Sequence, residues 1–298
     1  MLLSACSKPI ADFTLKDAQK ENQLPLLLQA DNTSSNASSY IWKLNGREVS
    51  TSANLEHPVY DSGRYIIELE AIEDGKTHIQ KKEIIVYPTE SCLLLMRTSH
   101  GDLVFELLED TPLHLRNMEQ LIESKYYNGL LFHRVIDDFM IQGGDNKSRS
   151  SGRRYDEPKP IDHEIITDYP HYRGALAAAR MPDAINPERA SSGSQFYIVD
   201  GREYDLERMR KVQRDKYFDY TEEQLLTYVD KGGAPQLDGE YTVFGYMKQG
   251  FEVLDKIATV RTDKYDRPVD DVKILEAVSY THLRAPRDAT LSRMPSSA

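Results

Sequence analysis

A short strand-like segment carries one positively charged side chain among apolar neighbours. In a regular strand Phe132, Arg134 and Ile136 share a face, because successive side chains point to opposite sides. A guanidinium on such a face needs polar partners, and the side-chain amide of Gln142 is a candidate acceptor. Because a guanidinium keeps its protons near neutral pH, its chemistry is the donation of hydrogen bonds. The alternative is a core strand whose arginine reaches the surface, and the pattern alone does not choose between them.

The composition argues against two other classes of site. The two cysteines are Cys6 and Cys92, and no CxxC motif or Cys/His cluster accompanies them, so we expect no metal site. Lysine and arginine number 37 against 48 aspartates and glutamates, a net charge of -11. This acidic balance argues against a nucleic-acid partner, which would require broad neutralisation of phosphates.

The elements around these residues divide the 298-residue chain into two expected domains. In the first, an alternating run ends at Asn45-Gly46, a pair that suits a tight hairpin turn. Residues 64–71 and 82–87 are further strand-like runs. Short strands between Asn, Ser and Gly clusters predict a β-sandwich over residues 9–88.

Residues 92–278 form the second expected domain. A hairpin is predicted around residues 99–102, where two apolar runs flank Ser, His, Gly and Asp. A helix is predicted to follow, with Thr111 as its N-cap and Pro112 in its first turn.

Two segments depart from this pattern. Residues 202–235 are rich in charge and tyrosine, and Thr221 and Gln224 fit a capping box before a short helix. We favour a solvated surface insertion without function for this segment. Residues 279–298 are aperiodic and basic, and we expect a disordered, non-native tail there.

Four segments of the second domain resemble the signatures of cyclophilins, in family order. They are YYNGLLFHRVIDDFMIQGGD at 126–145, GALAAAR at 174–180, SGSQFYI at 192–198 and LDGEYTVFG at 237–245. The resemblance implies peptidyl-prolyl cis-trans isomerase activity on proline-containing polypeptides. The fold expected for the whole chain is mainly β, with an immunoglobulin-like sandwich followed by a closed eight-stranded antiparallel barrel with two capping helices.

The resemblance also implies the roles of the site residues. Arg134 would hydrogen-bond the nitrogen of a twisted X-Pro amide, and Gln142 would orient it. Rotation breaks no covalent bond, so no nucleophile, metal, general acid or cofactor is required. The substrate-binding positions implied by the motifs are Phe139, Met140, Ala179, Arg180, Gln195, Phe196, Leu237 and Tyr241.

Some positions carry finer expectations. The backbone of Arg180 would bind a substrate carbonyl, and Tyr241 stands where many family members carry His. Gln236 stands where cyclosporin-sensitive members carry Trp, so we expect weak cyclosporin binding. His133 is interpreted as a packed, structural histidine.

The N-terminus resembles a bacterial lipobox, Leu3-Ser4-Ala5-Cys6, and residues 1–8 are interpreted as a signal remnant and tether lipidated at Cys6. Pieces of the first domain resemble PKD-like modules, and a spacer is the favoured role. We therefore expect a lipid-anchored monomer of the cell envelope, with a cytoplasmic protein as the alternative. Two alternative functions stay open, a proline-peptide binding module with weak catalysis and a surface scaffold.

Overall fold

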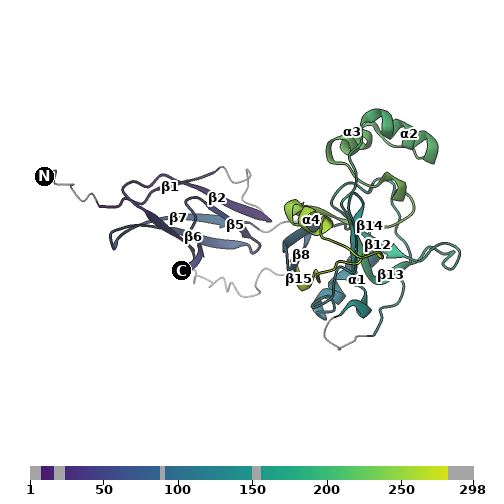
Figure 1. Ribbon diagram of the computed structural model, residues 1–298, viewed down its shortest axis with the longest axis horizontal. Helices are drawn as coiled ribbons and strands as arrows, with labels where there is room; N and C mark the ends of the chain where they lie inside the picture. Colours follow the sequence, from purple (N-terminus) through teal and green to yellow (C-terminus); the bar gives the residue numbers. More distant parts are fainter. Residues whose placement is uncertain (1–7, 17–23, 88–90, 150–155, 281–298) are drawn as a thin grey trace, which may run out of the picture.

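A computed structural model describes residues 8–16, 24–87, 91–149 and 156–280. Within these ranges lie two bodies of strands, each with its own buried core, arranged end to end in Figure 1. The predicted lipid site at Cys6 lies outside the described residues, as does the predicted tail beyond Tyr280. Ser279 and Tyr280, which were assigned to that tail, belong instead to the last strand.

The N-terminal body consists of two antiparallel sheets of three and four strands. The first sheet has the order β1 (Phe13–Leu15), β2 (Leu26–Asn32), β5 (Leu55–Val59). The second has the order β4 (Arg47–Ser50), β3 (Ser39–Leu44), β6 (Gly63–Glu73), β7 (Lys76–Val86).

The two sheets bury one common core. Trp42 from the second sheet is fully buried, and its ring meets Phe13 of the first sheet edge to face, with 5.1 Å between centroids. The indole Nε1 donates to the Ser52 carbonyl at 3.0 Å, so its polar atom is satisfied. Asn45 and Gly46 have φ values of 50° and 78°, which confirms the predicted tight turn.

The C-terminal body is built on one curled sheet of eight antiparallel strands. In spatial order these are β10 (Arg134–Ile136), β11 (Met140–Gly143), β13 (Ser191–Val199), β12 (Ala175–Arg180), β14 (Val243–Gln249), β9 (Gly101–Leu107), β8 (Cys92–Thr98) and β15 (Ile274–Tyr280).

The prediction of a closed barrel is wrong, because β10 and β15 remain the edges of an open sheet. The chain just before each edge strand is irregular, and only an isolated bridge joins Leu131 to Lys273. Three backbone hydrogen bonds span the same seam. The amides of Gly129 and Phe132 donate to the carbonyls of Ile274 and Val272 at 2.7 and 2.9 Å, and the Ile274 amide donates to the Leu130 carbonyl at 2.8 Å. The seam is therefore held by isolated hydrogen bonds instead of a continuous ladder.

Two helices pack against the core of this sheet, as predicted, and two more were not predicted as capping elements. The packing helices are α1 (Pro112–Glu123) and α4 (Phe251–Ala258), and the others are α2 (Leu206–Lys216) and α3 (Glu222–Lys231). Short 3-10 turns are η1 (Asn146–Ser148) and η2 (Pro235–Leu237). None of the helices in the described ranges is long and apolar enough to cross a membrane.

The helix starts agree with the sequence to different degrees. Thr221 and Gln224 form the predicted capping box of α3. Pro112 begins α1 as predicted, but the Thr111 hydroxyl donates to the Leu108 carbonyl instead of capping the helix. The carboxylate of Glu164 accepts the first amide protons of α1, so the cap comes from a distant loop.

Strand β8 supplies side chains to both bodies. Cys92, Leu94 and Met96 belong to the core under the eight-stranded sheet, whereas Leu93 packs in the N-terminal core. Tyr280, opposite Leu93 in the ladder, stacks on Tyr60 of the N-terminal body with 6.5 Å between ring centroids.

Candidate active site

Arg134 begins the edge strand β10 and lies directly opposite Gln142 of β11. Gln142 in turn lies opposite Tyr197 of β13. Residues opposite one another in a ladder project to the same face, so these three side chains form a row across three strands. The Arg134 side chain is 45% exposed, as its position on an edge strand allows. Phe132 precedes the strand and packs in the interior core, so the prediction that it shares a face with Arg134 is wrong.

The guanidinium of Arg134 pairs with Asp266, a residue that lies outside the four signature segments. Its Nε lies 3.4 Å from the Asp266 carboxylate, and the Val135 amide donates to the Asp266 carbonyl at 2.8 Å. Gln142, the predicted partner, instead donates its side-chain amide to Gln195 at 3.1 Å. Among the described residues the orienting contact of Arg134 therefore comes from a carboxylate, whose charge strengthens the hydrogen bond.

The turn of this hairpin is held by Asp200, the residue that directly follows β13. Asp138 adopts a φ of 59°, a conformation that aspartate tolerates better than most residues. Its amide donates to the Asp200 carboxylate at 3.0 Å. Burial raises the pKa of Asp200 to about 6, with the Asp138 amide and Arg173 acting in the opposite direction.

Beside the row lies a set of packed apolar side chains, which we call the apolar cluster. Its buried members are Met140, Ala175, Ala177, Tyr197, Val199, Ala234 and Val243, and its partly buried members are Leu108, Ile136, Phe139, Tyr169, Ala179, Leu237, Tyr241 and Tyr246. The rings of Tyr197 and Tyr241 meet edge to face at 5.9 Å. Its members that the sequence analysis assigned to substrate binding are Phe139, Met140, Ala179, Leu237 and Tyr241.

Phe196 does not belong to the apolar cluster. It is 1% exposed and packs in the interior core, with ring contacts to Tyr127 at 5.5 Å and Phe132 at 6.1 Å. Neighbouring residues of a strand point to opposite faces, so the next residue, Tyr197, occupies the place predicted for Phe196. The alternation along β13 was the signal that could have corrected the assignment, because Gln142 and Tyr197 share a face.

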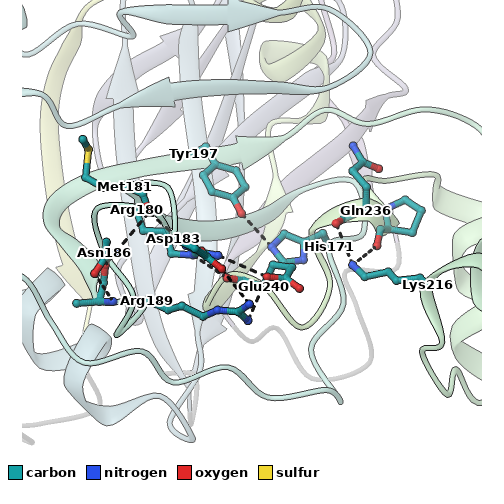
Figure 2. Close-up of polar contacts among 12 residues, drawn as sticks. His171, Arg180, Met181, Asp183, Asn186, Arg189, Tyr197, Lys216, Gln236 and Glu240 are labelled. Carbon is teal, nitrogen blue, oxygen red and sulfur yellow. Dashed lines mark hydrogen bonds and ion pairs between the residues drawn. The ribbon is translucent and has the colours of Figure 1, made fainter.

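Arg180 uses its side chain within the protein. Its Nε donates to the Glu240 carbonyl at 2.9 Å, it pairs with Asp183, and its guanidinium lies 4.7 Å from the Tyr241 ring centroid. Arg189 binds the same two acids, Asp183 at 3.0 Å and Glu240 at 3.1 Å (Figure 2). The side chain is thus committed to holding loop 181–190 against Glu240.

The backbone at this point departs from regular pairing. The β12–β13 register shifts between Ala178 and Arg180, which leaves Ala179 outside the paired positions. Such a bulge re-aims the local backbone and is compatible with a contact to a bound chain. The predicted roles of Ala179 and Arg180 through their backbone stay predictions.

The remaining chemistry of the site is simple. Burial lowers the pKa of His133, so its ring is neutral at neutral pH. No group of three His, Cys, Asp or Glu side chains that could hold a metal occurs in the ranges the structure describes. The arrangement offers an exposed guanidinium next to the apolar cluster, which suits a ligand with an apolar ring beside a hydrogen-bond acceptor.

Known proteins are similar in sequence and structure to the C-terminal part of this chain. A family model described as cyclophilin type peptidyl-prolyl cis-trans isomerase/CLD matches residues 93–279. A Staphylococcus saprophyticus protein with the provisional name peptidyl-prolyl cis-trans isomerase is 35% identical over 182 residues, which cover 61% of this chain and 88% of that protein. A Staphylococcus haemolyticus protein with the same provisional name is 33% identical over 180 residues, covering 60% and 86%. A Cryptosporidium parvum cyclophilin type isomerase of known structure is 27% identical, with a TM-score of 0.48 over 65% of this chain and 99% of that one.

Proposed function

This chain belongs to the cyclophilin-type peptidyl-prolyl cis-trans isomerase family, and from that premise we propose that it speeds X-Pro bond rotation with Arg134 at the reacting amide. The substrates of the family are proline-containing polypeptides. The observation that carries the assignment of Arg134 is its exposed guanidinium, which shares a sheet face with Gln142 and Tyr197 beside the apolar cluster.

The reaction needs little from an enzyme. Rotation about an X-Pro bond takes tens to hundreds of seconds unaided, because the partial double-bond character of the amide must be lost. In the twisted amide the prolyl nitrogen regains a lone pair that can accept a hydrogen bond. A donor fixed near that nitrogen therefore binds the transition state better than the planar ground state, which is the condition for catalysis.

We assign these tasks to neighbouring residues. The apolar cluster receives the proline ring, chiefly through Met140, Leu237 and Tyr241. Asp266 binds Nε of Arg134, which leaves the terminal guanidinium nitrogens to meet the prolyl nitrogen. The Gln142–Gln195 hydrogen bond forms the adjoining edge of the site.

The decisive experiment is a prolyl-peptide isomerisation assay on the whole chain with Arg134→Ala and Arg134→Lys. Loss of a preorganised transition-state donor is expected to lower kcat by about 100-fold or more in Arg134→Ala. Arg134→Lys keeps the charge but lacks the planar fork, so it is expected to restore only part of the rate. An Arg134→Ala enzyme as fast as an active wild type would exclude this mechanism, whereas a wild-type chain no faster than the uncatalysed reaction would favour a proline-binding module instead.

We further propose that the N-terminal body is a PKD-like, immunoglobulin-type spacer over residues 9–88, followed by the isomerase domain over 92–278. Two facing sheets of three and four strands around Trp42 support this proposal. Removal of residues before Pro88 is its test. A spacer, when removed, leaves the isomerase activity of the monomeric truncated chain unchanged, whereas loss of partner binding would identify a binding domain.

We also propose that the chain is exported and lipidated at Cys6, on the support of the lipobox-like Leu3-Ser4-Ala5-Cys6. Labelled fatty acid should enter the natural protein in its host and not a Cys6→Ser variant. Absence of label from both proteins would contradict lipidation and favour the cytoplasmic alternative.

A further inference from the structure

The segment between β13 and β14 folds back onto the site. Helices α2 and α3 pack around a small core that is rich in tyrosine, including Tyr220 and Tyr228, which are 6% and 0% exposed. Tyr228 contacts the ring of Tyr172 at 4.8 Å, in the loop before β12. The interpretation of residues 202–235 as a merely solvated insertion is therefore incomplete.

A buried carboxylate joins this helical hairpin to the rest of the body. Asp238 is 2% exposed and accepts the hydroxyls of Tyr220 and Tyr228, each at 2.6 Å. Its other oxygen accepts the backbone amide and the Nδ1 of His171, at 2.7 and 2.8 Å. A buried charge is tolerated when its oxygens are satisfied in this way, and the contacts then hold all the participants in one geometry.

The chain of hydrogen bonds continues to the apolar cluster. The second ring nitrogen of His171, Nε2, lies 3.0 Å from the Tyr197 hydroxyl, and Figure 2 shows the two side chains pointing toward each other. Burial raises the pKa of Tyr197, which therefore stays protonated and can donate to Nε2 while Nδ1 donates to Asp238. Tyr197 is thereby fixed from its hydroxyl end while its ring packs against Tyr241.

A second set of contacts holds the turn that carries Leu237. Lys216, at the end of α2, donates to the carbonyls of Pro235 and Gln236 at 3.0 and 2.9 Å (Figure 2). The Tyr220 hydroxyl also lies 3.3 Å from the Pro235 carbonyl. These carbonyls belong to η2, which contains Leu237, so the hydrogen bonds from the insertion hold the backbone of Leu237 in place.

We propose that the insertion is part of the substrate-binding apparatus. Asp238 belongs to the fourth signature and accepts hydrogen bonds from Tyr220 and Tyr228 of the insertion. Together with Lys216 of the insertion, it is a positioning residue that fixes Leu237 and Tyr197 for the proline ring. The proposal rests on the proposed isomerase function and extends it to a segment outside the four family signatures. The apolar side chains of Leu237 and Tyr197 would contact the proline ring equally in the planar ground state and in the twisted transition state of the amide. Misplacing these side chains should therefore weaken substrate binding and leave the rotation step nearly unchanged.

The test is to separate KM from kcat in the whole chain. Lys216→Met keeps the alkyl stem and removes both hydrogen bonds to η2, and we expect KM for a prolyl peptide to rise about three- to ten-fold with kcat within about two-fold. Lys216→Arg retains donors and should restore most of the KM. Lys211→Met, at an exposed position of the same helix, is the matched control and should leave both constants unchanged.

Tyr220→Phe provides a second, milder variant should Lys216→Met fail to fold. It keeps the ring in its core and removes only the hydroxyl that binds Asp238 and approaches Pro235, and it should also raise KM. Variants that melt at a lower temperature but keep wild-type KM and kcat while folded would overturn the proposal, because the insertion would then serve stability alone. Failure of the isomerase function itself would appear separately, as a wild-type chain that does not exceed the uncatalysed rate.

Discussion

Substitution of Asp266 by Asn tests how the guanidinium of Arg134 is held. The carboxylate lies 3.4 Å from Nε, and both side chains are nearly half exposed, at 45% and 44%. Asp266 has a φ of 62°, which Asn adopts readily and Ala does not. Asn therefore removes the charge while keeping the backbone conformation and the carbonyl that binds Val135.

The expected loss is small, because the pair is long and accessible to water. Exposed ion pairs contribute about 0.2–1 kcal/mol, so kcat/KM should fall by about 1.4- to 5-fold. Removal of the guanidinium itself removes the donor to the twisted amide and should cost about 100-fold or more. The difference between the two losses separates orientation of the donor from donation itself.

The assay is kcat/KM for a prolyl peptide at low and high salt. Salt screens an exposed pair, so wild type should fall toward the rate of Asp266→Asn as ionic strength rises, whereas the variant should change little. Asp270→Asn, an exposed position in the same segment, controls for loss of a negative charge nearby. A loss beyond about 30-fold would exceed what such a pair supplies and would refute a purely orienting role. A faster variant would refute it too, since the carboxylate would then be weakening the donor.

Three further outcomes follow from the structure. Burial raises the pKa of Asp200 from 3.8 to about 6, so its favourable contribution is complete below pH 3.8 and is lost as pH rises through 6. The loss amounts to about 3 kcal/mol, and Asp200→Asn should flatten the fall of Tm between pH 4 and 7; parallel curves for the two proteins would contradict this. Gly144→Ala should lower Tm more than Gly129→Ala, because both have φ near 85° but only the Gly144 methyl would collide with the Ser194 carbonyl; equal losses in thermal melts would show that φ alone matters. Gln236 is exposed on η2, and cyclosporin should bind weakly there; a sub-micromolar Kd by calorimetry would contradict this.

Local signals in the sequence predicted the local structure well. The Asn45-Gly46 turn and the capping box at Thr221 depend on neighbouring residues alone, and the structure contains both. Helix α2 was not predicted, although Asp205 caps its first turn by accepting the Arg208 amide at 2.7 Å. The helix is so rich in charged residues that its sequence lacks a clear apolar periodicity, because Met209 is its one buried residue.

The parts of the site that escaped prediction depend on contacts between distant segments. Asp266 reaches Arg134 across 132 positions of sequence, and no spacing rule connects them. Asp238 lies within a recognised motif, yet its role depends on tyrosines of a segment outside that motif. The prediction that placed Phe196 in the substrate-binding site, where the structure has Tyr197, was wrong for a different reason. A shift of one residue along a strand moves a side chain to the opposite face of the sheet.

The position of Leu93 couples the unfolding of the two bodies. It is 3% exposed in the N-terminal core, while its backbone pairs with β9 and β15 of the catalytic sheet. Unfolding of β8 would therefore remove Leu93 from the N-terminal core and break the hydrogen bonds of β8 to β9 and β15. We accordingly expect the two bodies to unfold in one cooperative transition. A catalytic fragment cut free would present Leu93 and the ring of Tyr280 beside the edge strand β15. Uncovered apolar side chains next to such an edge promote self-association, so we expect the N-terminal body also to protect the enzyme from aggregation.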